Sequence, residues 1–231
     1  MTTHHTAPAV TDQNRGSTPP PKTRALLIAG AAAGPLFYLS AIVQMATRPG
    51  FDLRAHPISQ LSTGGLGWIQ MLTFALTGLG LVCLAIGHRK IVTTGAGRGA
   101  IPVLIAIGGL GFIVAGVFPQ DPAYGFPLGT PDGPAAATSW HAAVHMAAAI
   151  IAFTALALAA LIALVRAIRA RRPPAAIGNG IVTLALLLPV IPDIAGIQVA
   201  VTGLFAFGWC TVVAARLLKD RPSAAVTDSV A

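Results

Sequence analysis

Residues 177–218 read IGNGIVTLALLLPVIPDIAGIQVAVTGLFAFGWCTVVAARLL, a 42-residue stretch with only two charged residues. One helix of this length would extend for about 60 Å, roughly twice the thickness of the hydrocarbon core of a bilayer. Pro189, Pro192 and Asp193 interrupt the stretch near its middle, where a proline ring and its missing N–H break a helix. The stretch therefore predicts two membrane-spanning helices joined by a tight turn at residues 191–194.

Four more apolar segments precede this stretch, and the overall composition fits a chain that crosses a membrane several times. The 231 residues are 55% hydrophobic and 10% charged, and the mean hydropathy is +0.75. Soluble domains carry about 25% charged residues. The sequence therefore predicts an all-α, polytopic membrane bundle of six transmembrane helices. The first four are expected at roughly 25–47, 66–87, 100–118 and 140–165.

The basic residues are grouped between the predicted helices and indicate the orientation of the chain. Of 15 Lys and Arg residues, only Arg48 and Arg54 fall on one side of the membrane. Positively charged loops stay in the cytoplasm, so both termini are expected there and the chain in the plasma membrane. The other basic residues, all on the predicted cytoplasmic side, are Arg15, Lys22, Arg24, Arg89, Lys90, Arg98, Arg166, Arg169, Arg171, Arg172, Arg216, Lys219 and Arg221.

The same clusters bear on the partners of the protein. The net charge of +8 is concentrated in short groups beside apolar runs, which is typical of contact with anionic lipid headgroups on the cytoplasmic side of the bilayer. No nucleic acid is expected. Residues 1–24 and 219–231 are predicted to be disordered cytoplasmic tails, and residues 25–218 are predicted to form the transmembrane domain. The oligomeric state is not indicated.

Histidine and aspartate side chains gather at the opposite, outer end. His141 and His145 stand four residues apart behind Ser139, a predicted N-cap, so their rings lie on one helix face. His56 and Asp121 would complete a set of four zinc ligands from neighbouring connections. We favour structural hydrogen bonds to loop carbonyls or waters for these residues. Metal binding, and ligand or proton sensing, stay open as alternatives.

The connection between the first two helices carries further signals. Arg48 and Arg54 are expected to form an outer ion-pair network with nearby aspartates, Asp193 among them, or Arg48 to hold an anionic headgroup. Pro57 predicts the start of a short interfacial helix.

Two other groups of residues predict the packing of the bundle. Interhelical hydrogen bonds are expected from Gln44, Gln70, Asn179 and Gln198, and close helix packing from Gly30, Gly34, Gly78, Gly80, Gly108, Gly109 and Gly111.

Five motifs together resemble those of a bacterial membrane-protein family, domain of unknown function 998. The motifs are Arg48-Pro-Gly-Phe-Asp52, His56-Pro57-x-Ser59-x-Leu61, Gly67-Trp68-x-Gln70, Phe118-Pro-x-Asp121-Pro122 and Trp140-His141-x-x-x-His145. The resemblance covers residues 25–218. It implies a six-helix bundle in which Asp52, His56, Ser59, Asp121, His141 and His145 belong to one outer cluster. The chain departs from the family pattern at Thr73 and at Val199, where Asn and Arg are expected.

The pattern is also loosely similar to a superfamily of seven-helix membrane hydrolases, of the ceramidase and progestin-receptor type. Those proteins gather Ser, Asp and His around a metal at one membrane face. This resemblance implies Asp52 and Ser59 as catalytic residues of a zinc-dependent hydrolase that acts on a lipid or on another substrate at the outer face. Our first interpretation is an integral membrane protein with an outward-facing His/Asp cluster, structural or ligand-binding, and no assigned reaction. The hydrolase and a small transporter are the alternatives, so whether the chain is an enzyme stays open.

Overall fold

The computed structural model describes residues 19–95 and 97–219, which fold almost entirely into helices. No β-strand occurs among these residues. The elements in chain order are α1 (Pro21–Thr47), η1 (Ile58–Ser62), α2 (Gly67–Ile91), α3 (Ala100–Val117), α4 (Trp140–Arg169), α5 (Pro173–Leu187), η2 (Pro192–Ile194) and α6 (Ala195–Lys219). Five of the helices are long and apolar enough to cross a membrane, and α5, with 15 residues, is shorter.

The helices lie where the sequence predicts them. The long stretch at 177–218 breaks into α5 and α6 around η2, because prolines interrupt the backbone hydrogen bonds there. A second 3-10 turn, η1, follows Pro57 as expected. Three boundaries differ by about one turn: α2 and α4 continue to Ile91 and Arg169, and α1 begins at Pro21, inside the predicted tail, since proline is favoured in the first turn of a helix. The rest of that tail, residues 1–18, and the C-terminal tail beyond residue 219 lie outside the described residues.

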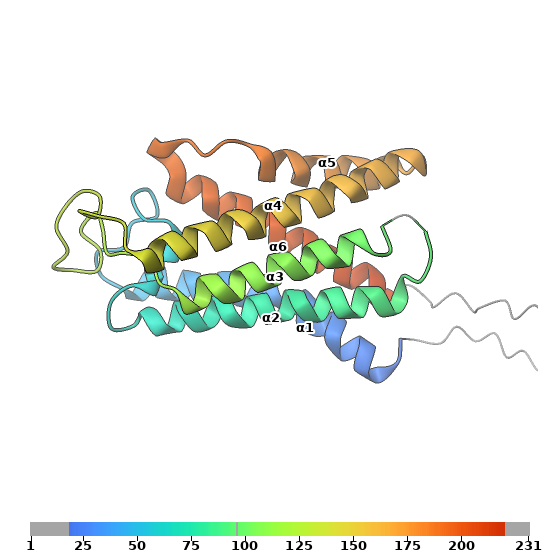
Figure 1. Cartoon of the computed structure of the whole chain (residues 1–231), viewed down its shortest axis with the longest axis horizontal. Coiled ribbons are helices and arrows are strands. Elements are labelled where there is room, and N and C mark those ends of the chain that lie inside the picture. Colours follow the sequence, from blue (N-terminus) through green and yellow to red (C-terminus); the bar gives the residue numbers. More distant parts are fainter. Residues whose placement is uncertain (1–18, 96, 220–231) are drawn as a thin grey trace, which may run out of the picture.

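The chain passes back and forth along one axis (Figure 1). Helix α2 packs between α1 and α3, α4 packs on α3, and α5 packs mainly on α4, while α6 returns to α1. The long loops 48–66 and 118–139 lie together at one end of the bundle, at the left of Figure 1. The shorter connections, 170–172 and the described residues 92–95 and 97–99, lie at the other end, beside the start of α1 and the end of α6.

Aromatic rings form the centre of the bundle. Phe37 of α1 contacts Phe74 of α2, with ring centroids 5.3 Å apart, and Phe207 of α6, at 5.0 Å. Phe112 of α3 also lies 5.0 Å from Phe207. Most other large apolar side chains point outward and are exposed in the isolated chain. Such a surface is compatible with a bilayer, because lipid hydrocarbon is as apolar as the side chains that it contacts.

Glycines bring the helix backbones into direct contact, as the sequence predicts. A Cβ placed on Gly30 would lie 2.6 Å from the Cβ of Leu84, and one on Gly34 would lie 2.8 Å from the Cβ of Phe207. At Gly78 the added atom would lie 2.8 Å from the backbone nitrogen of Ile113. Small residues permit this approach, and in lipid the resulting van der Waals contact is a main source of helix association.

Candidate functional site

The family-like motifs converge at the end of the bundle covered by residues 48–66 and 118–139, here called the loop cap. Both segments follow the end of a helix, so each must satisfy backbone groups that no helix pairs. The turn between α5 and α6 also reaches the loop cap, because Gly196 packs directly against the backbone carbonyls of Leu53 and His56. A side chain at that position would collide with both.

Arg48 is the most buried charge of the loop cap and ends α1 as its C-cap. It is 8% exposed. Its Nη1 donates to the carbonyl of Leu61 at 2.5 Å, and its Nη2 donates to the carbonyl of Thr63 at 2.6 Å. The guanidinium also lies 4.7 Å from the ring centroid of Phe126. Burial lowers the pKa of Arg48 from its usual value, but guanidinium groups stay charged in proteins. Arg48 therefore joins α1, the segment around η1 and the second loop, and makes no ion pair with a described acid.

His56 connects the two loops of the cap and is 2% exposed. The backbone N–H of Asp52 donates to its Nδ1 at 2.9 Å, and its Nε2 lies 2.9 Å from the carbonyl of Tyr124. A carbonyl only accepts, so Nε2 carries the hydrogen and Nδ1 presents its lone pair. The rings of Phe51 and Phe126 lie 5.3 and 5.4 Å from the imidazole. Both ring nitrogens are thus engaged by backbone groups.

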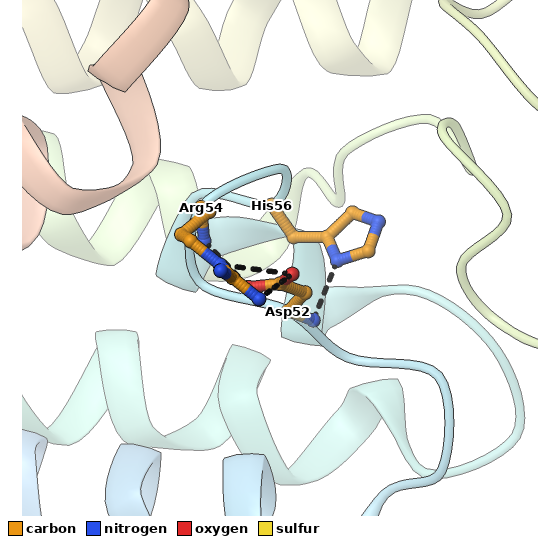
Figure 2. Close-up of polar contacts among 3 residues, drawn as sticks. All are labelled: Asp52, Arg54 and His56. Carbon is orange, nitrogen blue, oxygen red and sulfur yellow. Dashed lines mark hydrogen bonds and ion pairs between the residues drawn. The ribbon is translucent and has the colours of Figure 1, made fainter.

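Asp52 and Arg54 form an ion pair beside His56. Arg54 Nη2 lies 3.1 Å from Asp52 Oδ2, and Oδ1 accepts from the backbone N–H of Arg54 at 2.9 Å. Figure 2 shows the two side chains against each other while the His56 ring points away from them. The hydrogen bond from Arg54 lowers the pKa of Asp52. The side chains of Arg54 and Asp52 are 81% and 46% exposed, so solvent screens their attraction.

Polar side chains of η1 fasten the second loop to the first. Gln60 Nε2 donates to the carbonyl of Asp121 at 2.8 Å, and Ser62 Oγ accepts from the backbone N–H of Gln120 at 3.0 Å. Asp121 in turn accepts, through Oδ2, from the N–H of Ser139 at 2.7 Å. Ser139 caps α4 by accepting from the N–H of Ala142 at 3.1 Å, as the sequence predicts. The chain of contacts therefore runs from η1 to the start of α4.

The two histidines of α4 have different surroundings. His145 is 2% exposed, and its Nδ1 lies 2.8 Å from the carbonyls of both Ala115 and Phe118, at the end of α3. It supplies a donor to carbonyls that the end of a helix leaves unpaired. His141 is exposed, and its ring stacks on that of Trp140 with centroids 3.7 Å apart. The spacing of four residues places His141 and His145 on the same side of α4, but only His145 points into the bundle.

The predicted zinc ligands are not brought together. Within residues 19–95 and 97–219, no group of three or more His, Cys, Asp or Glu side chains is arranged to hold a metal ion. His56 and His145 each bond to a backbone carbonyl of another segment, and Asp121 accepts from Ser139. His141 stacks on its neighbour instead. The donor atoms that zinc would need are engaged separately, so this arrangement does not fit the group.

The other candidate residues are also separate. Ser59 is half-buried in η1, and neither it nor Asp193 of η2 makes a side-chain hydrogen bond within the described part of the chain. Asp193 is exposed and has no ion pair with a described residue. The turn that carries it is held by Gln198, whose side chain bonds to the N–H of Ile191 and the carbonyl of Pro189. The predicted network of Arg48, Arg54 and Asp193 is thus reduced to the pair of Arg54 with Asp52.

A buried polar layer lies under the loop cap, between α1 and α2. Gln44 Nε2 donates to Gln70 Oε1 at 2.7 Å, and Ser40 and Thr73 share a hydrogen bond of 2.7 Å beside them. This is the interhelical bonding that the sequence predicts for the two glutamines. Asn179 likewise receives a bond from Trp209 across α5 and α6, at 2.8 Å. The sequence predicted that these amides bond between helices but gave no sign of which partner each finds.

The apolar surface and the helical bundle define the chain as an integral membrane protein. The fold thus identifies the class of protein, and a comparison of sequences identifies the family. Residues 31–216 match the family described as "Protein of unknown function (DUF998)". The chain belongs to this family, as its motifs suggested. No match is found among curated proteins or solved structures. The family description names no activity, so the function rests on the site itself.

Proposed function

We propose that the chain is a six-span protein of the plasma membrane with both termini in the cytoplasm, and that the family motifs build a rigid structural cap on its outer face. The protein then acts as a membrane-embedded binding protein rather than as a hydrolase. The observation that carries this proposal is the choice of partners in the loop cap. His56, Gln60 and His145 each bond to a backbone carbonyl of a different segment, and Arg48 bonds to two carbonyls further along its own segment.

The six-span topology is supported by lengths and charges. Helix α5 extends for about 22 Å, and the four residues that follow it, of which Leu188 and Ile191 have extended backbone, add at most roughly 13 Å. Together they match the thickness of the hydrocarbon core, about 30 Å. A crossing by α5 also keeps the basic cluster at the end of α6 on the same side as the other clusters, which agrees with the positive-inside rule.

Cysteine labelling in intact cells tests this topology. A variant without Cys83 and Cys210 receives single cysteines at Thr130, in the loop cap, or at Asp193, in the turn before α6. A membrane-impermeant maleimide should label both in intact cells. Cysteines introduced at Thr94 and Lys219 should react only after the membrane is opened. Labelling of Lys219→Cys without labelling of Thr94→Cys in intact cells would exclude six spans, and labelling of both with protection of Thr130→Cys and Asp193→Cys would reverse the orientation.

The structural role of the cap is tested separately. If the motif side chains only hold loops together, removing one should lower thermal stability and leave metal content unchanged. The purified native protein should contain no stoichiometric zinc, and a chelator should not alter its melting temperature. One zinc per chain, lost in the His141→Ala, His145→Ala double variant, would instead support a metal-dependent hydrolase.

A further inference from the structure

A cavity of about 470 Å³ lies at the other end of the bundle from the loop cap. It is bordered by the second half of α4, the start of α5 and the second half of α6, with His88 of α2 and Ile101 of α3 at its edge. The cavity exists because α5 packs on α4 and α6 packs on α1, whereas α4 and α6 hardly touch. Its volume falls in the range of roughly 300–1,000 Å³ that is usual for small-molecule sites.

The lining of the cavity is amphipathic. Most of its wall consists of apolar side chains, among them Val182, Leu204 and Phe205, and its charged residues are Arg166 and Arg216. No acid lines the cavity. The aspartates that the structure describes lie instead in the loop cap and in η2, and the one ion pair among the described residues joins Arg54 to Asp52. The two arginines therefore face the cavity without a described anionic partner.

One polar atom in the wall also lacks a partner. His88 is 4% exposed, and its Nδ1 makes no hydrogen bond. A buried polar atom without a partner is destabilising, and such atoms are uncommon in native structures. The neighbouring polar pair is satisfied, since Trp209 Nε1 donates to Asn179 Oδ1 at 2.8 Å. His88 Nδ1 has almost no accessible surface, so it lies beside the cavity without opening into it.

We propose that this cavity binds one anionic phospholipid. Its phosphate lies between Arg166 and Arg216, and an acyl chain lies along Val182, Leu204 and Phe205. Guanidinium groups suit phosphate because their N–H groups form a fork that matches two oxygens. Basic pockets between transmembrane helices are a known mode of anionic lipid binding. This proposal goes beyond the structural cap, because it assigns a ligand class and a site at the opposite end of the bundle.

The cavity contains a natural reporter. Trp209 lines it, whereas the other two tryptophans, Trp68 and Trp140, start α2 and α4 beside the loop cap. In a Trp68→Phe, Trp140→Phe background, Trp209 is the only source of indole fluorescence. Brominated acyl chains quench indole on contact. Brominated phosphatidylglycerol should therefore quench Trp209 at a several-fold lower mole fraction in the bilayer than brominated phosphatidylcholine.

Charge variants test whether the two cavity arginines cause this preference. The Arg166→Gln, Arg216→Gln double variant should lose this several-fold preference, so that brominated phosphatidylglycerol and brominated phosphatidylcholine quench Trp209 equally. The matched control is Arg169→Gln, Arg171→Gln, which removes two charges from the same end of the bundle outside the cavity lining. An equal loss in the control would overturn the proposal, because general surface charge would then explain the preference.

Cavity-filling variants test the position of the lipid. Gly208 lines the cavity, and a Cβ there would meet no atom within 4 Å, so Gly208→Leu fills the space without a backbone collision. It should remove most of the quenching. Gly65→Leu, equally open but in the loop cap, should not. Gly178→Leu, also open and in the cavity wall, replaces Gly208→Leu if that variant fails to fold.

Three results contradict the proposal. These are equal quenching by the two phospholipids, undiminished quenching in a folded cavity-filling variant, and stronger quenching by a brominated fatty acid than by phosphatidylglycerol. The last would show that the cavity prefers a free carboxylate amphiphile. Bilayers with the same lipids in both leaflets are used throughout, so the outcome does not depend on which end of the protein faces the cytoplasm.

Discussion

Replacing Arg48 is the sharpest test of how the loop cap is held together. Arg48→Met keeps an unbranched apolar side chain of similar length and removes every donor. Two charge-assisted hydrogen bonds, to the carbonyls of Leu61 and Thr63, disappear, as does the contact with the Phe126 ring. Each bond contributes roughly 1.5–3 kcal/mol, and the ring contact contributes about 1 kcal/mol.

Part of that loss is offset, because methionine carries no charge that must be kept out of water. The expected net destabilisation of Arg48→Met is therefore about 2–4 kcal/mol. For a chain of this length, 1 kcal/mol corresponds to a fall of roughly 2–4 °C in melting temperature. The variant should thus melt about 5–15 °C below the native protein. Arg48→Lys should recover only part of the loss, since one ammonium lacks the fork that reaches both carbonyls.

The assay is thermal unfolding of detergent-purified protein, followed by intrinsic fluorescence after size exclusion has shown a single folded species. Arg54→Gln is the control, because Arg54 also belongs to the cap but its side chain is 81% exposed. Its melting temperature should equal that of the native protein. The reasoning fails if Arg48→Met melts with the native protein, or if the two variants lose the same stability.

Three further variants extend the test to neighbouring elements. His145→Ala should destabilise by about 2–4 kcal/mol, because it leaves two helix-end carbonyls unpaired and a cavity behind, whereas His141→Ala should melt with the native protein; equal losses would contradict the assigned burial. Gly78→Ala should cost about 1–3 kcal/mol by overpacking α2 against α3, while Gly208→Ala should be neutral or stabilising in the same melts. Asp121→Ala should cost about 1–2 kcal/mol and speed amide hydrogen exchange in the first turn of α4. Unchanged exchange would show that Asp121 does not stabilise that turn.

The helices were predictable because their signals are local. An apolar run of about 20 residues must form a helix in a bilayer, since every backbone group needs a partner within the segment, and prolines mark where such a run breaks. These two facts placed the break between α5 and α6 near the middle of residues 177–218. The predicted start of α1 at Ala25 was four residues too late. The helix begins at Pro21, and its first residues are too polar to give an apolar signal. The serine cap of α4 was also readable, since a cap depends on neighbours within three residues.

The partners of the polar side chains were not predictable. The sequence correctly grouped Arg48, His56 and His145 at one end of the bundle. For the histidines it favoured hydrogen bonds to loop carbonyls, with zinc as an alternative, and for Arg48 it predicted ion pairs, but it did not indicate which carbonyl each side chain would meet. A side chain of either kind bonds equally well to a carbonyl, and backbone carbonyls have no signature in sequence. The loops brought the carbonyls of Leu61, Thr63 and Tyr124 within reach. These contacts between residues distant in sequence determine the hydrogen-bond partners in the loop cap.

The sequence by itself therefore determined the class of this protein, the positions of its helices and the separation of basic from acidic groups along its axis, because hydrophobicity, proline and charge act over a few residues. Only the tertiary structure decided that the two α4 histidines have different surroundings, and that α4 and α6 leave a basic, apolar-walled cavity between them. Both depend on how whole helices pack against one another, and the packing of helices in lipid is set by the shapes of many small contacts.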